Sequence, residues 1–201
     1  MKKKETIILG IDPGTRITGY GIIKSYDNRL ELIAIGIIEL YKLENHYIKL
    51  KKIFDRTLQL IKTYKVDEFS VESTFYGKNI QSTLKLGRAQ GVSIAAALSC
   101  SIPVFEYAPR KIKQAITGNG NASKEQVASL LEKFLFIKNL KRDLDATDGL
   151  AVAVCHQFQN KMINKIENNS VNSWKEFINK NPKRVKFQKI LKYLIFFAIF
   201  F

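Results

Sequence analysis

Four carboxylic acids occupy positions where folding alone does not require an acid. Asp12 ends an apolar run of strand length, residues 7–11, and a sharp Pro-Gly turn follows it. Glu72 ends a second short strand, and Asp145 and Asp148 open the last predicted helix. A carboxylate at the end of a buried strand is costly unless a cation meets it. The sequence therefore points to a metal ion, or to a phosphate held through one.

The spacing of the acids supports one shared site. Asp145 and Asp148 are three residues apart, so they share a face of a helix. Two neighbouring strand ends and one helix start can converge on a single point in a sheet-and-helix fold. Four converging carboxylates raise one another's pKa unless cations neutralise them. Mg²⁺ suits such a site because it takes hard oxygen ligands and retains water and substrate phosphate.

Each acid also has an ordinary structural explanation. Asp145 with Asp148 could be a helix N-cap followed by a favourable acid in the first turn. Glu72 could be a solvated strand end, and Asp12 could belong to a simple turn. The set of four is more specific than any of its members, because a turn at Asp12 does not require the other acids beside it.

The elements that must position these acids follow from hydrophobic periodicity. Strands alternate with helices after an initial antiparallel meander, whose second and third strands are joined by a turn at residues 27–28. This order predicts an α/β fold, a mixed sheet with helices packed on its faces. The predicted strands are residues 6–12, 18–24, 30–39, 67–72 and 103–107. The predicted helices are residues 44–64, 78–99, 110–117, 123–136 and 146–159, with a capping box at Ser123 and Gln126.

The composition indicates how many domains the chain forms and which class of partner it binds. The 201 residues are 46% hydrophobic, which suits one globular domain, residues 1–160. The net charge of +15 favours a nucleic-acid partner, although compositional bias contributes to it. Residues 161–201 read as a basic linker with an apolar C-terminal tail, partly disordered. The apolar end, residues 193–201, is shorter than the about 20 residues that span a bilayer, so no membrane is expected.

Two isolated cysteines, Cys100 and Cys155, fit a reducing compartment and argue against a disulfide scaffold or a zinc site. The short apolar stretch near the N-terminus does not resemble a signal peptide. We therefore expect a cytoplasmic protein.

Several segments match a known family in order along the chain. Ile-Leu-Gly-Ile-Asp-Pro-Gly-Thr-Arg-Ile-Thr-Gly-Tyr-Gly surrounds Asp12, and Asp-Ala-Thr-Asp-Gly-Leu-Ala-Val-Ala begins at Asp145. Between them lie matching segments at residues 71–79, 86–92, 107–114 and 118–127. Together they resemble the RuvC family of bacterial Holliday-junction resolvases, in the ribonuclease-H-like superfamily. The resemblance covers about residues 6–158 and gives no support to the tail.

The resemblance implies a ribonuclease-H-like mixed five-stranded sheet and a catalytic site. In that family the matching acids hold two Mg²⁺ per active site, with Mn²⁺ as a substitute. The ions clamp the attacking water and the leaving oxygen during displacement at phosphorus. The implied product is a nick with a 5′-phosphate and a 3′-hydroxyl. The implied catalytic and metal-binding residues are Asp12, Glu72, Asp145 and Asp148.

The resemblance also implies DNA contacts. Phe75 would wedge or stack at the junction crossover, although a core position is equally compatible with its sequence context. Lys113 and Lys124 match basic positions that meet phosphates near the scissile bond. Further cations would extend that surface, although a single surface cation is more often only solvated: Lys78, Lys85, Arg88, Arg110 and Lys111.

The implied partners are a four-way DNA junction, a second copy of the chain and branch-migration proteins, in homologous recombination and DNA repair. A C₂ dimer with two sites matches the near two-fold symmetry of a junction. Family dimers pair through the long helix after Glu72, where Gly87 and Gly91 would allow close approach.

Three alternatives stand beside this hypothesis. Gly-Ile-Asp-Pro-Gly-Thr is also similar to the phosphate loop of actin-like ATPases, but 201 residues are too few for their two domains. A relative in the same superfamily that acts on RNA is disfavoured by Phe75 and by the Asp145–Asp148 pair. A binding protein that has lost catalysis is disfavoured because all four acids are present.

Overall fold

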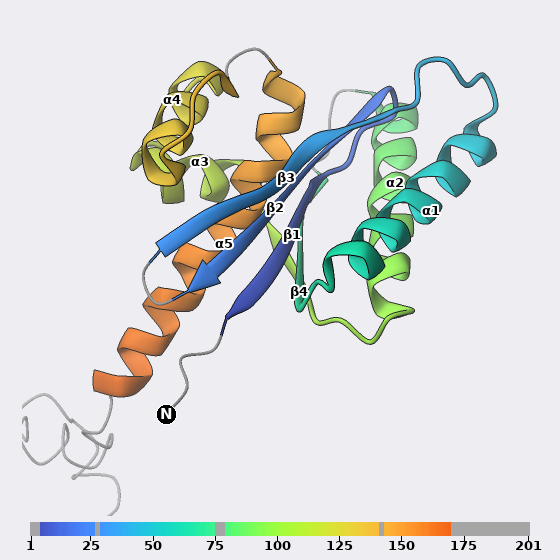
Figure 1. The fold of residues 1–201 in the computed structure, drawn as a ribbon. Helices are drawn as coiled ribbons and strands as arrows, with labels where there is room; N and C mark the ends of the chain where they lie inside the picture. Colours follow the sequence, from blue (N-terminus) through green and yellow to red (C-terminus); the bar gives the residue numbers. More distant parts are fainter. Residues whose placement is uncertain (1–4, 27–28, 75–78, 141–142, 170–201) are drawn as a thin grey trace, which may run out of the picture. The chain divides into compact units, whose positions relative to one another are not determined.

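The computed structural model describes residues 5–26, 29–74, 79–140 and 143–169, which form a five-stranded mixed sheet with helices on both faces (Figure 1). This confirms the predicted fold class. The strands are β1 (Thr6–Asp12), β2 (Ile17–Tyr26), β3 (Arg29–Glu39), β4 (Glu68–Glu72) and β5 (Val104–Tyr107). The helices are α1 (His46–Tyr64), α2 (Ile80–Leu98), α3 (Pro109–Thr117), α4 (Lys124–Leu135) and α5 (Leu144–Asn169). Contacts divide the chain into Met1–Asn160 and Lys161–Phe201, and the sheet lies in the first unit.

The strand order is β3-β2-β1-β4-β5. β2 pairs antiparallel with both β1 and β3, whereas β4 pairs parallel with both β1 and β5. The carboxyl ends of β1, β3, β4 and β5 therefore meet at one edge of the sheet, called the carboxyl edge below. Asp12 and Glu72 are the last residues of β1 and β4, so both stand at this edge.

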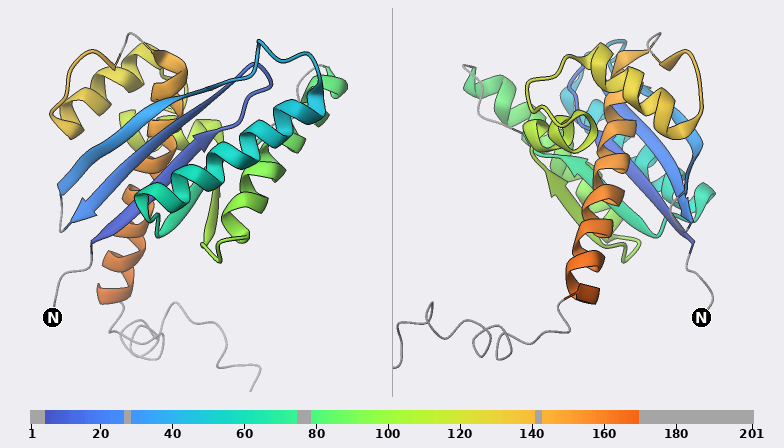
Figure 2. Two further views of the ribbon diagram at one scale, coloured as in Figure 1. Left: turned by 45° about the vertical axis from the view of Figure 1, so that its right-hand side comes forward. Right: turned by 90° about the vertical axis from the view of Figure 1, so that its left-hand side faces the viewer.

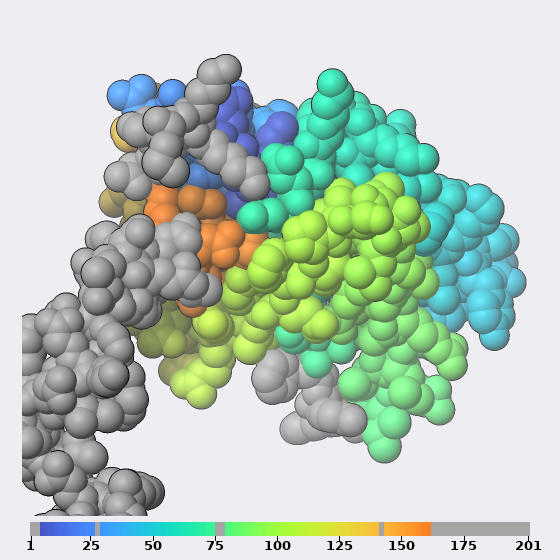
Figure 3. All heavy atoms as spheres, turned by 90° about the horizontal axis from the view of Figure 1, so that it is seen from below, coloured from blue at the N-terminus to red at the C-terminus, as the bar shows by residue number. Residues whose placement is uncertain are grey.

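Two helical layers bury the two faces of the sheet (Figure 2). α1 and α2 lie side by side on one face, where Leu9, Ile11 and Phe69 are fully buried (Figure 3). α3, α4 and α5 cover the other face, where Ile8 and Leu150 are fully buried. Each such side chain contributes roughly 1.5–3 kcal/mol by leaving water. Successive side chains of β1 point to opposite faces of the sheet, so this one short strand packs against both helical layers.

Caps fix where the helices begin. At the start of α4 the Ser123 hydroxyl accepts a hydrogen bond from the Gln126 N–H at 3.3 Å, and the Gln126 Oε1 accepts from the Ser123 N–H at 2.9 Å. The predicted capping box is thus confirmed. At the start of α1 the Asn45 Oδ1 accepts from the Tyr47 N–H at 2.8 Å, so this helix begins at His46 rather than at residue 44.

The start of α5 rests directly on the backbone of β1 and β2. A Cβ atom added to Gly19 would lie 1.9 Å from the Asp145 carbonyl oxygen, and one added to Gly149 would lie 2.5 Å from the Tyr20 Cα. Gly10 makes a similar approach to the backbone of Gly149. Because only glycine leaves room for this contact, the glycines hold the first turns of α5 against the carboxyl edge.

α5 differs most from its predicted bounds. It begins at Leu144 because the Asp143 Oδ1 caps the helix, accepting from the Ala146 N–H at 3.1 Å. It continues to Asn169 rather than ending at residue 159, since residues 160–169 contain no proline or glycine to stop it. No helix in the described residues is long and apolar enough to cross a membrane. The expected turn at residues 27–28 and the apolar tail at residues 193–201 lie outside the described residues.

Candidate active site

Three of the four predicted acids line one cavity at the carboxyl edge. The cavity has a volume of about 210 Å³ and receives Asp12 from β1, Glu72 from β4 and Asp148 from α5. Lys113 of α3 and Lys124 of α4 line it as well. Its apolar walls come from the helices that cover this face: Pro109, Ile112, Val127 and Ala151. Three segments distant in sequence thus place their carboxylates around one space.

Asp145 lies beside this cavity and is not among the described residues that line it. Its carboxylate is half exposed, and its Oδ1 lies 3.6 Å from the Lys124 Nζ. Because Asp143 caps α5, the alternative explanation of Asp145 as the N-cap is wrong. Asp145 instead occupies the first turn of the helix, one turn before Asp148.

Burial and repulsion from neighbouring carboxylates raise the pKa of Asp12 and of Glu72. Burial, followed by the charges of Asp148 and Asp145, raises the pKa of Asp12 from 3.8 to about 7, although Lys124 opposes this. Burial, followed by the charges of Asp12 and Asp148, raises the pKa of Glu72 from 4.5 to about 8, although Lys124 and Lys113 oppose this. Nearby lysines therefore offset only part of the cost of ionising the two acids.

Lys124 neutralises the α5 side of the site. Its ammonium forms an ion pair and hydrogen bond with the Asp148 Oδ2. Burial lowers the pKa of Lys124, but the contact with Asp148 and the charges of Asp148, Asp145 and Asp12 outweigh it, so the pKa is raised. Burial still raises the pKa of Asp148 despite this contact.

The donor set fits a hard divalent cation in its chemistry. All four acids offer only oxygen, and the cavity carries carboxylates whose ionisation lacks full compensation. Among the described residues, no three His, Cys, Asp or Glu side chains are already arranged to hold an ion. In this arrangement Lys124 supplies the positive charge at Asp148.

Thermal stability without divalent metal is expected to fall as the pH rises from 5 to 9. A carboxyl group whose folded pKa is raised stabilises the fold below its ordinary pKa and loses that contribution as the pH passes its folded pKa. For Asp12 and Glu72 the loss proceeds from their ordinary pKa values upward and is complete at about pH 7 and 8, above which stability levels off. One pKa unit equals about 1.4 kcal/mol, so above pH 5 the loss is on the order of 3–4 kcal/mol for each of the two groups.

Differential scanning fluorimetry in EDTA measures this dependence. The matched Asp12→Asn/Glu72→Gln variant keeps the size of both side chains and is expected to show a flatter profile between pH 5 and 9. Equal slopes for the two proteins would contradict the assigned electrostatics.

The predicted DNA-binding residues fall into three groups. Lys113 and Lys124 line the cavity, so their ammonium groups lie where a scissile phosphate would sit, and phosphate contact stays a prediction for both. Arg88 is exposed on α2, on the other layer of the molecule. Phe75 and Lys78 lie outside the described residues.

A buried polar network behind the site was not anticipated from the sequence. The fully buried His156 of α5 contacts the Tyr107 hydroxyl with its Nδ1 at 2.7 Å and the Glu68 Oε2 with its Nε2 at 2.8 Å. Burial raises the pKa of Tyr107 to about 12, so its hydroxyl keeps its proton beside the His156 Nδ1. The Asn160 side chain donates to the same Glu68 oxygen at 3.0 Å. The network joins β4, β5 and α5, and a lone histidine in an apolar helix was its only sequence signal.

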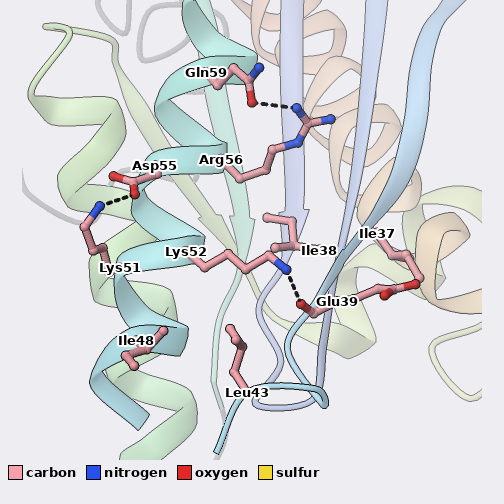
Figure 4. A pocket seen from close by; sticks show the side chains of 10 residues that line it. All are labelled: Ile37, Ile38, Glu39, Leu43, Ile48, Lys51, Lys52, Asp55, Arg56 and Gln59. Carbon is pink, nitrogen blue, oxygen red and sulfur yellow. Dashed lines mark hydrogen bonds and ion pairs between the residues drawn. The ribbon is translucent and has the colours of Figure 1, made fainter. Parts of the chain in front are cut away.

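A larger cavity, of about 580 Å³, lies between β3 and α1 and contains none of the four acids (Figure 4). Its polar side chains are largely paired with one another. Lys51 pairs with Asp55, the Lys52 Nζ donates to the Glu39 carbonyl oxygen at 2.9 Å, and the Arg56 Nη1 donates to Gln59 at 2.7 Å. This cavity therefore lacks the unneutralised carboxylates that mark the smaller one.

Comparisons with known proteins agree with this geometry. The sequence profile described as "Crossover junction endodeoxyribonuclease RuvC" matches residues 8–156. A protein of the same description from Porphyromonas gingivalis is 53% identical over 189 residues, covering 92% of this chain and 100% of that relative. The relative from Bacteroides fragilis is 56% identical over 185 residues, covering 91% of this chain and 97% of its own length.

A solved structure gives the same result. The structure of Thermus thermophilus RuvC in complex with a Holliday junction substrate is 27% identical. It aligns with a TM-score of 0.69 over 78% of this chain and 96% of that chain. The chain therefore belongs to the family of the crossover junction endodeoxyribonuclease RuvC.

Proposed function

We propose that this protein is a structure-specific endonuclease that resolves four-way DNA junctions by paired symmetric nicks. The observation that carries the proposal is the small cavity that gathers Asp12, Glu72 and Asp148 between two lysines. Membership of the RuvC family supplies the substrate class, since a relative was solved with a Holliday junction substrate.

The proposed reaction is hydrolysis of one phosphodiester in each of two strands. A water oxygen forms a bond to phosphorus while the bond from phosphorus to the 3′ oxygen breaks. One water proton ends on the leaving oxygen, so the products are a 3′-hydroxyl and a 5′-phosphate. Lys113 and Lys124 offset the negative charge of the phosphate, and the apolar walls from α3 and α4 limit the entry of other water.

Asp12, Glu72, Asp145 and Asp148 would hold two Mg²⁺, or Mn²⁺ in their place, which supply Lewis-acid stabilisation of the charge that develops at phosphorus. The raised pKa values of Asp12 and Glu72 support this assignment, because nearby cations would restore both carboxylates to their ionised form at neutral pH. The Lys124 ammonium occupies the Asp148 Oδ2, so Asp148 would bind a metal through its Oδ1 or after this ion pair opens.

We further propose a homodimer that pairs through α2. Ile80, Leu84 and Leu98 are exposed apolar residues of this helix. Together with Gly87 and Gly91 they follow one another at steps of four, three, four and seven residues. A Cβ added to Gly91 meets no atom within 4 Å, so this position is open within the chain. Such spacing forms one apolar seam along a helix, and two copies joined across it give two sites related by two-fold symmetry.

The cellular role that follows is homologous recombination and DNA repair in the cytoplasm. Branch-migration proteins that deliver the junction would be its partners there. Neither the cavity nor the α2 seam identifies those proteins by chemistry, so this part of the proposal rests on the family alone.

Cleavage of matched substrates tests the proposed function. A synthetic four-way junction and a linear duplex of the same sequence are incubated with the protein in Mg²⁺, with EDTA samples as the control. We expect symmetric nicks in the junction and none in the duplex or in EDTA. Equal cutting of both substrates, or of neither, would overturn the assignment. Sedimentation of the same samples measures the number of chains per junction, and a single chain would contradict the dimer.

A further inference from the structure

A second group of cations stands at the carboxyl edge, on the side away from Lys113 and Lys124. It consists of Lys49 from the first turn of α1 and of Lys85 and Arg88 from the first half of α2, together with the neighbouring imidazole of His46. These four residues are called the α1–α2 cluster. Neither α1 nor α2 has an acidic residue in its first turn. The cluster is therefore a concentration of positive charge built from two neighbouring helices.

The positive charges of the cluster act on the imidazole of His46. Burial lowers the pKa of His46, and the positive charges of Arg88, Lys85 and Lys49 lower it further. The His46 Nε2 is buried and has no hydrogen-bond partner in the described part of the structure. Three positive charges thus act on one imidazole whose Nε2 has no partner in the described residues, and an anion bound beside them would offset their mutual repulsion.

Carboxylates do not neutralise the cluster. Within the described residues, none forms an ion pair with Lys49, Lys85 or Arg88. The cations further along α1 differ: Lys51 pairs with Asp55, and Lys52 donates to the Glu39 carbonyl oxygen (Figure 4). On α1, the lysines that line the cavity between β3 and α1 therefore have partners, whereas Lys49 at the start of the helix has no ion-pair partner in the described residues.

The topology places the cluster beside the carboxylates. α1 and α2 follow β3 and β4, so both helices start at the carboxyl edge (Figure 1). The Lys49 Nζ donates to the Thr15 carbonyl oxygen at 3.5 Å, in the loop that follows Asp12. Lys113 and Lys124 belong to the opposite helical layer. The acids accordingly stand between two basic groups, one from each layer.

We propose that the α1–α2 cluster is a second phosphate-binding site, which binds the DNA backbone at a phosphate other than the scissile one. A polyanion crossing the carboxyl edge would meet Lys113 and Lys124 on one side and Lys49, Lys85 and Arg88 on the other. It would thereby supply the negative charge that the cluster lacks. This inference rests on the proposed function, because it takes DNA as the substrate, but it assigns a separate contact outside the carboxylate cavity.

The salt dependence of junction binding tests the site. Each phosphate contact that is lost lowers the slope of log affinity against log salt by about 0.9. We expect Lys49→Ala/Lys85→Ala to reduce the slope by about two and to weaken binding on the order of tenfold at moderate salt. Binding is measured without divalent metal, so that no cutting occurs.

The matched control is Lys51→Ala/Lys62→Ala, which removes the same charge from α1. Lys51 is paired with Asp55, and Lys62 lies in the last turn of α1, at the opposite end from the cluster. We expect this control to keep the slope of the unmodified protein, and Lys49→Arg/Lys85→Arg to keep it as well. Circular dichroism verifies that each variant is folded before binding is compared.

Two outcomes would overturn the inference: an unchanged slope in Lys49→Ala/Lys85→Ala, or an equal fall in the control. The second outcome would mean that overall charge, not a local site, governs binding. Failure of the unmodified protein to cut the junction in Mg²⁺ contradicts the proposed function instead. The slopes measured without metal separate these two failures.

Discussion

Replacing Asp12 with asparagine is expected to abolish junction cleavage in Mg²⁺ while leaving junction binding largely intact. Asp12 stands at the centre of the proposed metal site, at the end of β1 between Glu72 and Asp148. Losing one electrostatic contact at a reacting centre costs about 10²–10³ in rate, and losing a residue that would hold the metal is expected to cost at least that. Junction binding is expected to persist because the substitution removes a negative charge from the surface that contacts the polyanionic DNA.

Single-turnover cleavage and binding in EDTA separate these two effects for Asp12→Asn. Asp55→Asn is the matched control, because it makes the same chemical change on the outer side of α1, where the carboxylate pairs with Lys51. We expect the control to cleave at the normal rate. Normal cleavage by Asp12→Asn would remove the proposed metal site, and loss of binding would show that Asp12 shapes the DNA surface itself.

Gly19→Ala is expected to be strongly destabilising. The added Cβ would lie 1.9 Å from the Asp145 carbonyl oxygen, which belongs to the backbone and cannot rotate away as a side chain could. Overpacking of a core costs typically 1–3 kcal/mol, and a backbone clash of this depth is expected to cost at least about 3 kcal/mol. The start of α5 must move to relieve it, which displaces Asp145 and Asp148 and should also reduce cleavage.

Chemical denaturation gives the free energy of unfolding for this comparison. Gly91→Ala is the matched control within one chain, since an added Cβ there meets no atom within 4 Å. Because Gly91 also lies in the proposed α2 seam, unfolding of both variants is followed at a protein concentration too low for the dimer to form. Alanine is favoured over glycine inside a helix by about 1 kcal/mol, so the control is expected to be neutral or slightly more stable. If Gly19→Ala unfolds at the same denaturant concentration as the unmodified chain, α5 does not rest on the β1–β2 backbone as described.

Hydrophobic periodicity predicted the strands well because their ends coincide with changes in composition. β1 ends at Asp12 and β4 ends at Glu72, as expected from the apolar runs before them. The start of α5 was less predictable, because Asp143, Asp145 and Asp148 are all acceptable near a helix N-terminus. Only the hydrogen bond from the Ala146 N–H identifies Asp143 as the cap and frees Asp145 for another role.

Tertiary contacts account for most of what the sequence did not reveal. The partners of Lys124 come from another helix, and no local pattern predicts that its ammonium meets Asp148. The Tyr107–His156–Glu68 network joins residues 49 and 88 positions apart, so its three members carry no shared spacing signal. Likewise, His46 and Arg88 belong to separate helices, and only their approach in the fold makes the α1–α2 cluster visible.

The direct backbone contact between α5 and the sheet has a consequence for sequence divergence. Where a helix packs through large side chains, each substitution in the interface shifts the helix and everything attached to it. Here glycines bring main chain against main chain, so the spacing between the Asp12 and Asp145 backbones does not depend on which apolar residues fill the surrounding core. We expect core residues in this family to drift freely while these glycines stay fixed. Such drift is compatible with the shared fold at 27% identity to the Thermus thermophilus protein.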